Sequence, residues 1–240
     1  MGKGLSYPAE LINCLEVFWG DGFLSPGGPQ EVCEILKGIP LSGRSILDIG
    51  CGIGRHVHHL AEQGFDVYAS DHSKSAIRAC REWLQSQKLL AELWCGEMED
   101  IPYPNATFDA CVAFNSIYHG TSERLDGVIR ILHAKMRTRG ECFVTLPSQE
   151  NRMYGRGECL GPGTYVSPGM YNKLFSHDGE RGVPHHFCSR EEVELLFRGF
   201  HIQSLKHEEL RLATIRGEAE IVWLPIRNAF FWRVVAIKKD

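Results

Sequence analysis

Three glycines and a carboxylate between positions 45 and 54 have the types and spacing of a nucleoside-binding turn. An apolar pair, Ile46 and Leu47, leads into Asp48, and every second residue after it is a glycine: Gly50, Gly52 and Gly54. This order predicts a buried strand, a tight turn and then a helix. Glycine reaches backbone conformations closed to other residues and lets a ligand approach the main chain closely. We expect a nucleoside cofactor at this turn, with Asp48 facing an ammonium group.

Two other nucleotide-binding patterns do not fit the turn. The dinucleotide pattern Gly-x-Gly-x-x-Gly needs its third glycine at position 55, which is Arg55 here. A phosphate-binding P-loop needs a Gly-Lys-Ser or Gly-Lys-Thr ending, which is also missing. A glycine-rich connection between a strand and a helix, with no ligand, stays open as the alternative.

The spacing Asp-x-Gly-x-Gly-x-Gly resembles the first motif of class I S-adenosylmethionine-dependent methyltransferases, and the resemblance extends over about Gly43 to Leu146. It implies a Rossmann-like fold with S-adenosyl-L-methionine as the cofactor, whose methionine half lies on the turn. The cofactor-binding residues that it implies here are Asp48, Gly50, Cys51, Gly52 and Gly54.

Asp71 is placed to bind the ribose of such a cofactor. It follows a second predicted strand, 21 residues after Gly50, and ligands of open α/β sheets bind outside the carboxyl ends of the strands. A carboxylate there can accept hydrogen bonds from both ribose hydroxyls, and we place the next residue, His72, in the same site. The alternative is a carboxylate at a helix N-terminus, although Ser73 suits that cap better.

The segment from Cys95 to Pro102 resembles the part of the family that runs past the adenine. Glu97 takes the place of the usual aspartate, and Met98 would pack on the ring face. The resemblance implies that Glu97 contacts or lies beside the adenine amino group. Alternatively, Glu97 and Glu99 are solvated loop charges.

The turn after the fourth predicted strand contains Asn115 and His119. In class I methyltransferases this turn faces both the methionine end of the cofactor and the acceptor substrate. We expect Asn115 to contact the cofactor. A histidine at its ordinary pKa of about 6.5 can remove a proton from an acceptor, so His119 is the candidate general base. A structural histidine is the alternative.

The N-terminal run from Leu15 to Gly28 resembles the lid of phosphoethanolamine methyltransferases, which methylate a primary amine stepwise. In that family a tyrosine before the lid pairs with a histidine after the fourth strand. The resemblance places Tyr7 and His119 in this pair, as catalytic residues, and Leu24 and Ser25 where the lid touches the cofactor.

Two departures from that family concern the acceptor. Leu15 stands where the lid has its first tyrosine, and Asn115 stands where the post-strand turn has an aspartate. A neutral amide lacks the charge that would hold a cationic acceptor. The second half of the chain shows no match to the phosphobase pocket.

The elements that position these residues alternate along the chain. Strands are expected at 45–49, 66–70, 91–95, 108–114 and 141–146, and helices at 54–63, 73–87 and 122–136. A capped helix at 189–197 and two strands at 200–205 and 231–237 complete the pattern. The alternation predicts an α/β fold, a mostly parallel seven-stranded sheet with helices on both faces.

The chain divides into an N-terminal helical lid, residues 1–40, and a methyltransferase domain, residues 41–240. Residues 147–188 are rich in glycine, proline and aromatic rings. A structureless loop of this length is uncommon unless it is functional, so we expect a cap inserted after the fifth strand.

Composition and charge narrow the classes of partner to be expected. The net charge of −4 gives no reason to expect nucleic acid, and no apolar run has the length, about 20 residues, that a membrane span needs. Nine dispersed cysteines without a Cys-x-x-Cys pair favour a reducing cytoplasm. We expect no metal site, because neither His56, His58 and His59 nor His185, His186 and Cys188 with Cys159 have a zinc spacing.

These observations predict an S-adenosylmethionine-dependent methyltransferase of a small molecule, with an amine as the favoured acceptor. Hydroxyl, carboxylate, thiol-like or metalloid acceptors stay open, as does a non-catalytic protein that binds S-adenosylmethionine. The sequence does not fix the oligomeric state.

Overall fold

A seven-stranded sheet positions the candidate site. The computed structural model describes residues 44–167, 182–216 and 220–240. The expected lid, with Tyr7, Leu24 and Ser25, lies outside these ranges. The strand order is β3-β2-β1-β4-β5-β10-β9. The strands are β1 (Ser45–Ile49), β2 (Asp66–Asp71), β3 (Glu92–Cys95), β4 (Phe108–Ala113), β5 (Met136–Pro147), β9 (Phe200–Arg216) and β10 (Glu220–Lys238).

The sheet is parallel except at one strand. β10 is antiparallel to both of its neighbours, β5 and β9, and the pairs from β3 to β5 are all parallel. The chain runs outward from β1 through β2 to β3 and then returns to place β4 on the other side of β1. Ligands of open α/β sheets bind at such a reversal, outside the carboxyl ends of the strands. The predicted fold is confirmed.

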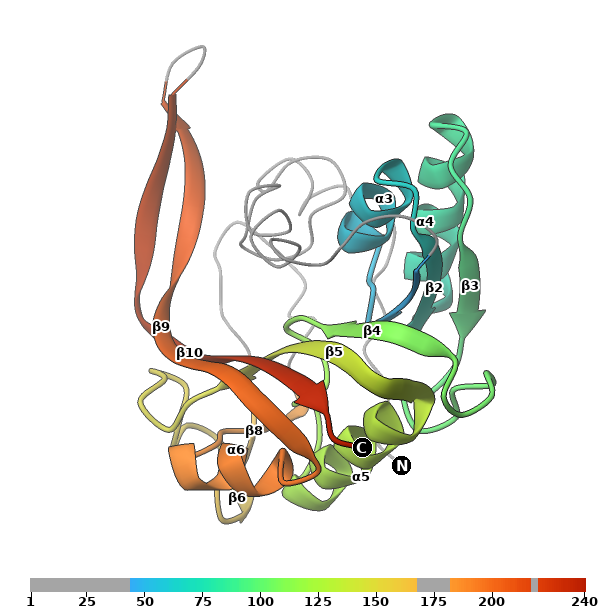
Figure 1. The fold of residues 1–240 in the computed structure, drawn as a ribbon. Helices are drawn as coiled ribbons and strands as arrows, with labels where there is room; N and C mark the ends of the chain where they lie inside the picture. The colour runs from blue at the N-terminus through green and yellow to red at the C-terminus, as the bar shows by residue number, and fades with distance from the viewer. Residues whose placement is uncertain (1–43, 168–181, 217–219) are drawn as a thin grey trace.

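Helices cover both faces of the sheet. In Figure 1, α3 (Arg55–Glu62) and α4 (Lys74–Ser86) lie on one face, and α5 (Ser122–Lys135) and α6 (Arg190–Leu196) lie on the other. The residues of β1 alternate between the two apolar clusters. Ile46 packs with α3 and α4, and Leu47 and Ile49 pack with α5 and α6. Asp48 has the parity of Ile46 and therefore points to the face of α3.

The last two strands are longer than the sequence indicated. They were expected at 200–205 and 231–237, but β9 and β10 continue as a hairpin paired out to Arg216 and Glu220. β5 pairs with β10 over Phe231–Ile237, and beyond that point the strand pairing of β10 in the described part of the chain is with β9. Figure 1 shows this hairpin rising away from the sheet. Among the described side chains, only those of the inner part of each strand pack on the apolar core, so the apolar pattern of the sequence predicted that part alone.

The expected cap contains a small sheet of its own. β6 (Glu158–Gly161), β7 (Thr164–Val166) and β8 (Pro184–His186) are antiparallel neighbours in that order. Backbone hydrogen bonds from His186 to the Tyr118 carbonyl (3.0 Å) and from Cys188 to the Pro147 carbonyl (2.9 Å) join β8 and the residues after it to the turn that follows β4 and to the end of β5. The cap thus lies beside the carboxyl ends of the central strands.

Among the described helices, none is both long and apolar enough to cross a membrane.

Candidate active site

The glycine turn is fixed by its neighbours. Gly50, Gly52 and Gly54 have φ angles of 72°, 56° and 98°, a region that favours glycine. A Cβ on Gly50 would lie 2.3 Å from the Cβ of Ser116, and a Cβ on Gly54 would lie 2.4 Å from the Sγ of Cys80. The amides of Gly50 and Cys51 both donate to the Ser70 carbonyl, at 2.8 and 3.0 Å. Backbone conformation and close packing therefore both require glycine in this turn.

Asp48 is buried, and one of its oxygens is unsatisfied. Its carboxylate is 1% exposed, and within the described ranges its Oδ2 makes no hydrogen bond, while the Nδ1 of His56 lies 3.8 Å from it. Burial raises the pKa of Asp48 to about 7, with Arg55 acting against this rise and Asp71 adding to it. A buried polar atom without a partner calls for an explanation, and a ligand ammonium supplies one. The site fits the charged end of S-adenosylmethionine.

Asp71 joins the glycine turn to the start of α4. Its Oδ2 accepts a hydrogen bond from the Gly52 amide at 2.9 Å, and its Oδ1 accepts from the Ser73 amide at 2.8 Å. Ser73 is the N-cap of α4, as expected, and accepts from the Ala76 amide. Each carboxylate oxygen can accept more than one hydrogen bond, so Asp71 keeps the capacity to bind a ribose hydroxyl. His72 lies beside it, with Nδ1 3.6 Å from the Asp71 Oδ1.

The two glutamates of the predicted adenine segment are paired with Arg124, a residue that the sequence analysis missed. The Nη2 of Arg124 donates to Glu97 at 2.7 Å and to Glu99 at 2.9 Å, and its Nη1 donates to the His119 carbonyl at 3.3 Å. Arg124 therefore ties the adenine segment to the turn of His119. Met98 is half-buried against the core. Adenine contact by Glu97 and Met98 stays a prediction.

The turn after β4 is held against β1 and β5. Asn115 has a φ of 49°, its amide donates to Thr145 Oγ1 at 2.8 Å, and its side-chain oxygen accepts from the same hydroxyl at 3.1 Å. Ser116 donates its hydroxyl to the Ile49 carbonyl at 2.7 Å. These contacts fix Asn115 at the edge where the cofactor was expected, and place the turn directly against Gly50.

His119 lies at this edge as a neutral ring. Burial lowers its pKa to about 3, with His185 and His72 acting in the same direction. A hydrogen bond with the backbone of Ser116 acts against that change, and the ring Nε2 is buried with no hydrogen-bond partner among the residues that the structure describes. The expectation of an ordinary pKa near 6.5 is therefore wrong, because that value belongs to a solvated imidazole. At neutral pH His119 is an acceptor for a ligand proton rather than a charged group.

The histidines of α3 have other partners. His56 is buried edge-on against Phe114 at 5.4 Å between ring centroids, and burial lowers its pKa. His58 stacks on Trp83 at 4.2 Å. These contacts give both rings a packing role.

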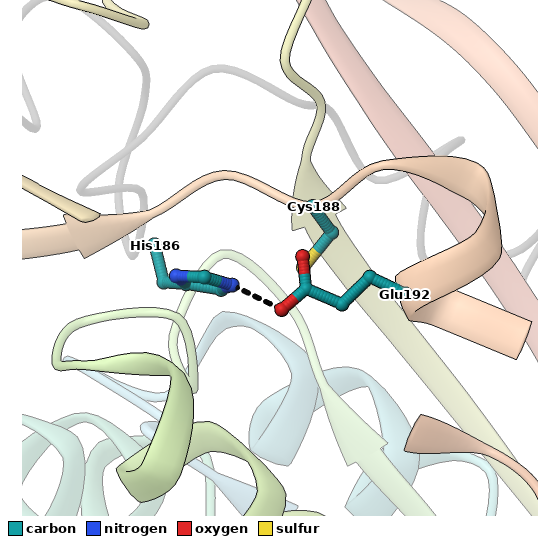
Figure 2. A group of neighbouring side chains, drawn as sticks. All are labelled: His186, Cys188 and Glu192. Carbon is teal, nitrogen blue, oxygen red and sulfur yellow. Dashed lines mark hydrogen bonds and ion pairs between the residues drawn. The ribbon is translucent and has the colours of Figure 1, made fainter. Parts of the chain in front are cut away.

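A second cluster joins the cap to α6. Figure 2 shows His186 and Glu192 pointing toward one another with Cys188 beside them, and their ligand atoms all lie within 4.8 Å of one another. The Nε2 of His186 meets Glu192 Oε1 at 2.7 Å, and its Nδ1 meets Thr164 Oγ1 at 2.8 Å. Burial and the nearby Glu192 carboxylate raise the pKa of the Cys188 thiol. The cluster's own hydrogen bonds engage both imidazole nitrogens, which supports a structural role.

Comparisons with known proteins agree with this geometry. Residues 46–140 match a family profile described as a methyltransferase domain. Phosphoethanolamine N-methyltransferase 1 of Zea mays is 32% identical over 117 residues, which are 48% of this chain and 23% of that protein. The ubiquinone biosynthesis O-methyltransferase of Xylella fastidiosa is 35% identical over 119 residues, 38% of this chain and 48% of that protein. The chain thus spans less than half the length of these relatives.

A solved structure shares the fold. A SAM-dependent methyltransferase from Methanosarcina mazei superposes with a TM-score of 0.67 at 19% identity, covering 85% of this chain and 97% of that one. The matched profile and the shared fold agree with the strand order and the glycine turn. Residues 46–140 match a methyltransferase domain, and the chain has the fold of that SAM-dependent methyltransferase.

Proposed function

We propose that this protein transfers a methyl group from S-adenosylmethionine to a small-molecule acceptor, with an amine nitrogen as the favoured target. One observation carries the proposal. Four buried side-chain polar atoms of the described residues have no hydrogen-bond partner, and two of them, Asp48 Oδ2 and His119 Nε2, lie at or beyond the ends of adjacent strands, where the strand order reverses. Unpaired buried atoms on both sides of a glycine turn fit a bound cofactor and its acceptor.

The residues of the turn would bind the cofactor along its length. Asp48 would hold the ammonium of the methionine half, and Asp71, oriented by the amides of Gly52 and Ser73, would accept from the ribose. Bound S-adenosylmethionine supplies a methyl group that is already activated. The protein then has to align the acceptor and keep water out, which are positioning effects.

His119 would orient the acceptor. A neutral imidazole nitrogen accepts a hydrogen bond from an N–H or O–H group and so directs the lone pair of that atom. Because the pKa of His119 is lowered to about 3, the ring stays neutral near pH 7 and does not hold a second proton. Its proposed role is therefore to accept a hydrogen bond from the methyl acceptor and to align it. The proton that the acceptor loses would pass to solvent. Tyr7, outside the described residues, remains its proposed partner.

The names of the relatives support either nitrogen or oxygen as the acceptor atom. The maize protein is an N-methyltransferase and the Xylella protein is an O-methyltransferase, and they match 48% and 38% of this chain. A hydroxyl acceptor is thus the second candidate, since it can also donate a hydrogen bond to His119.

Binding and turnover test the proposal separately. Calorimetry with S-adenosylhomocysteine should show one site per chain, and a panel of primary amines, hydroxyl compounds and carboxylates should then reveal turnover. Absence of binding would overturn the proposal. Binding without turnover on any acceptor would favour a non-catalytic cofactor-binding protein. Preferred turnover of a hydroxyl compound would replace the amine by the second candidate.

A further inference from the structure

Arg124 holds the segment that is expected to run past the adenine. Its Nη2 donates to Glu97 Oε2 at 2.7 Å and to Glu99 Oε2 at 2.9 Å, and its Nε donates to Glu99 Oε1. The guanidinium therefore binds both oxygens of Glu99 but one oxygen of Glu97. Among the described residues, Glu97 Oε1 has no hydrogen-bond donor, so this oxygen keeps its capacity to accept from a ligand.

The stem of Arg124 is fixed on the turn that carries His119. The Arg124 amide donates to the Oγ1 of Thr121, the N-cap of α5, at 3.3 Å. A Cβ on Gly120 would lie 2.6 Å from the Arg124 Cδ, so the stem packs directly on that glycine. Its Nη1 donates to the His119 carbonyl at 3.3 Å. Exposed ion pairs contribute little partly because two long side chains must be ordered, and these contacts already order Arg124.

The stability of α5 does not account for an arginine at this position. Arg124 lies in the first turn of the helix, where the helix dipole disfavours a positive charge and favours an acid such as Glu123. Its hydrogen bonds act in the opposite direction: Glu99 raises the pKa of Arg124, and Arg124 lowers the pKa of Glu99. The contacts beyond the helix therefore explain the arginine better than the helix does.

Resting on the proposed function, we infer that Arg124 is a positioning residue that holds Glu97 with its Oε1 toward the amino group of the cofactor adenine. The amino group donates hydrogen bonds, and a carboxylate oxygen accepts them. Glu99, whose two oxygens both bind the guanidinium, orients Arg124. Because Arg124 is anchored on the turn of His119, it also fixes the nucleoside end of the cofactor relative to the acceptor turn.

Three variants and two ligands test this inference by calorimetry, with urea denaturation to check that each variant folds. The ligands are S-adenosylhomocysteine and its purine analogue, which has hydrogen in place of the adenine amino group. Arg124→Gln removes the cation, and Arg124→Lys keeps a charge that cannot form the planar, forked contact. Arg130→Gln is the matched control, because Arg130 lies on the same helix in an exposed ion pair with Asp126.

We expect the wild type to prefer S-adenosylhomocysteine to the purine analogue at least about tenfold, the size of one charge-assisted hydrogen bond. Arg124→Gln should reduce that preference about three- to tenfold, because the ligand itself must then order Glu97. The loss should concern S-adenosylhomocysteine and leave the affinity for the purine analogue unchanged. Arg124→Lys should recover part of the preference, and Arg130→Gln should match the wild type.

Three results would overturn the inference. They are no preference in the wild type, an unchanged preference in Arg124→Gln, and an equal loss for both ligands, which a merely structural residue would give. Should Arg124→Gln not fold, the same comparison in Arg124→Lys decides. These measurements need no acceptor, so they are separate from the test of methyl transfer. The expected preferences without turnover on any compound of the panel would count against the proposed function and support the role of Arg124.

Discussion

Ser116 packs so closely on Gly50 that a Cβ on the glycine would lie 2.3 Å from the serine Cβ. Gly50 belongs to the proposed cofactor turn, and Ser116 begins the turn that carries His119. The Ser116 hydroxyl also donates to the Ile49 carbonyl at 2.7 Å. The positions proposed for the cofactor and the acceptor are thus joined by one contact between the ends of β1 and β4.

Gly50→Ala tests this contact. The added methyl group must displace Ser116, and the alanine must keep a φ of 72°. We therefore expect the free energy of unfolding to fall by several kcal/mol, at least the ~1–3 kcal/mol typical of backbone strain alone. S-adenosylhomocysteine binding should be lost as well. Gly64→Ala is the matched control, because Gly64 has a similar φ of 83° but nothing within 4 Å of a Cβ. Gly64→Ala should lose only the stability that backbone strain costs, without the loss from a clash. Equal urea midpoints for the two variants would contradict the account.

Asp48→Asn should weaken ligands that carry the amino acid group. We expect a loss of at least about tenfold in affinity for S-adenosylhomocysteine, since a charge-assisted hydrogen bond contributes about 1.5–3 kcal/mol. 5′-Methylthioadenosine, which lacks that group, should bind to wild type and variant alike. Calorimetry with both ligands checks this, and an equal loss for the two would show that the variant damages the turn itself.

Proton release should accompany cofactor binding. The pKa of Asp48 is raised to about 7, so near pH 6.5 much of the unliganded protein carries a proton there, and an ammonium partner favours its loss. Affinity for S-adenosylhomocysteine should therefore rise as pH increases through about 7. Calorimetry at pH 6.5 in buffers of different ionisation enthalpy should show release of a fraction of a proton. Asp48→Asn should abolish that release, and proton uptake by the wild type would contradict the assignment.

The pH profile of kcat/KM for the acceptor should show no ionisation of His119 near the ordinary pKa of histidine. Because its pKa is lowered to about 3, kcat/KM for the acceptor at saturating S-adenosylmethionine should not fall by protonation of this ring between pH 8 and pH 5. His119→Ala should reduce kcat/KM about 10- to 100-fold through lost alignment. An acidic limb near 6.5 that disappears in His119→Ala would instead establish a charged general acid or base.

The bond between His186 and Glu192 should stabilise the cap. Glu192→Ala leaves a buried imidazole nitrogen without its partner, which costs about 1–3 kcal/mol of unfolding free energy. Glu194→Ala is the control, because its bond to Arg190 is exposed and such pairs contribute about 0–1 kcal/mol. Urea denaturation compares the two, and a chelator should leave the wild-type midpoint unchanged. A larger loss in Glu194→Ala, or a chelator effect, would contradict the structural role.

The sequence predicted the central fold because local patterns determine it. Strand β1, the caps at Ser73 and Ser189 and the fold class all follow from apolar periodicity and capping residues. The length of β9 and β10 could not be predicted, because within the described ranges the outer parts of these strands pair with each other and not with the central sheet. The same limit applies to the cap, whose three short strands are held by contacts with distant turns.

The residues of the candidate site also divide into those that the sequence predicted and those that it did not. Asp48 and Asp71 follow from a contiguous motif and from their place at strand ends, and the structure places both beside the glycine turn, where their cofactor contacts stay predictions. Arg124 and His185 reach the site from α5 and β8, and no short motif marks either of them. The low pKa of His119 depends on burial by the cap and on His185, so only the folded chain reveals it.

A crystal structure with S-adenosylhomocysteine tests the central claim most directly. The account predicts the ligand ammonium within hydrogen-bond distance of Asp48 Oδ2, the ribose at Asp71, and the sulfur facing the turn of His119. A ligand bound elsewhere, or one whose ammonium leaves Asp48 Oδ2 without a partner, would contradict it.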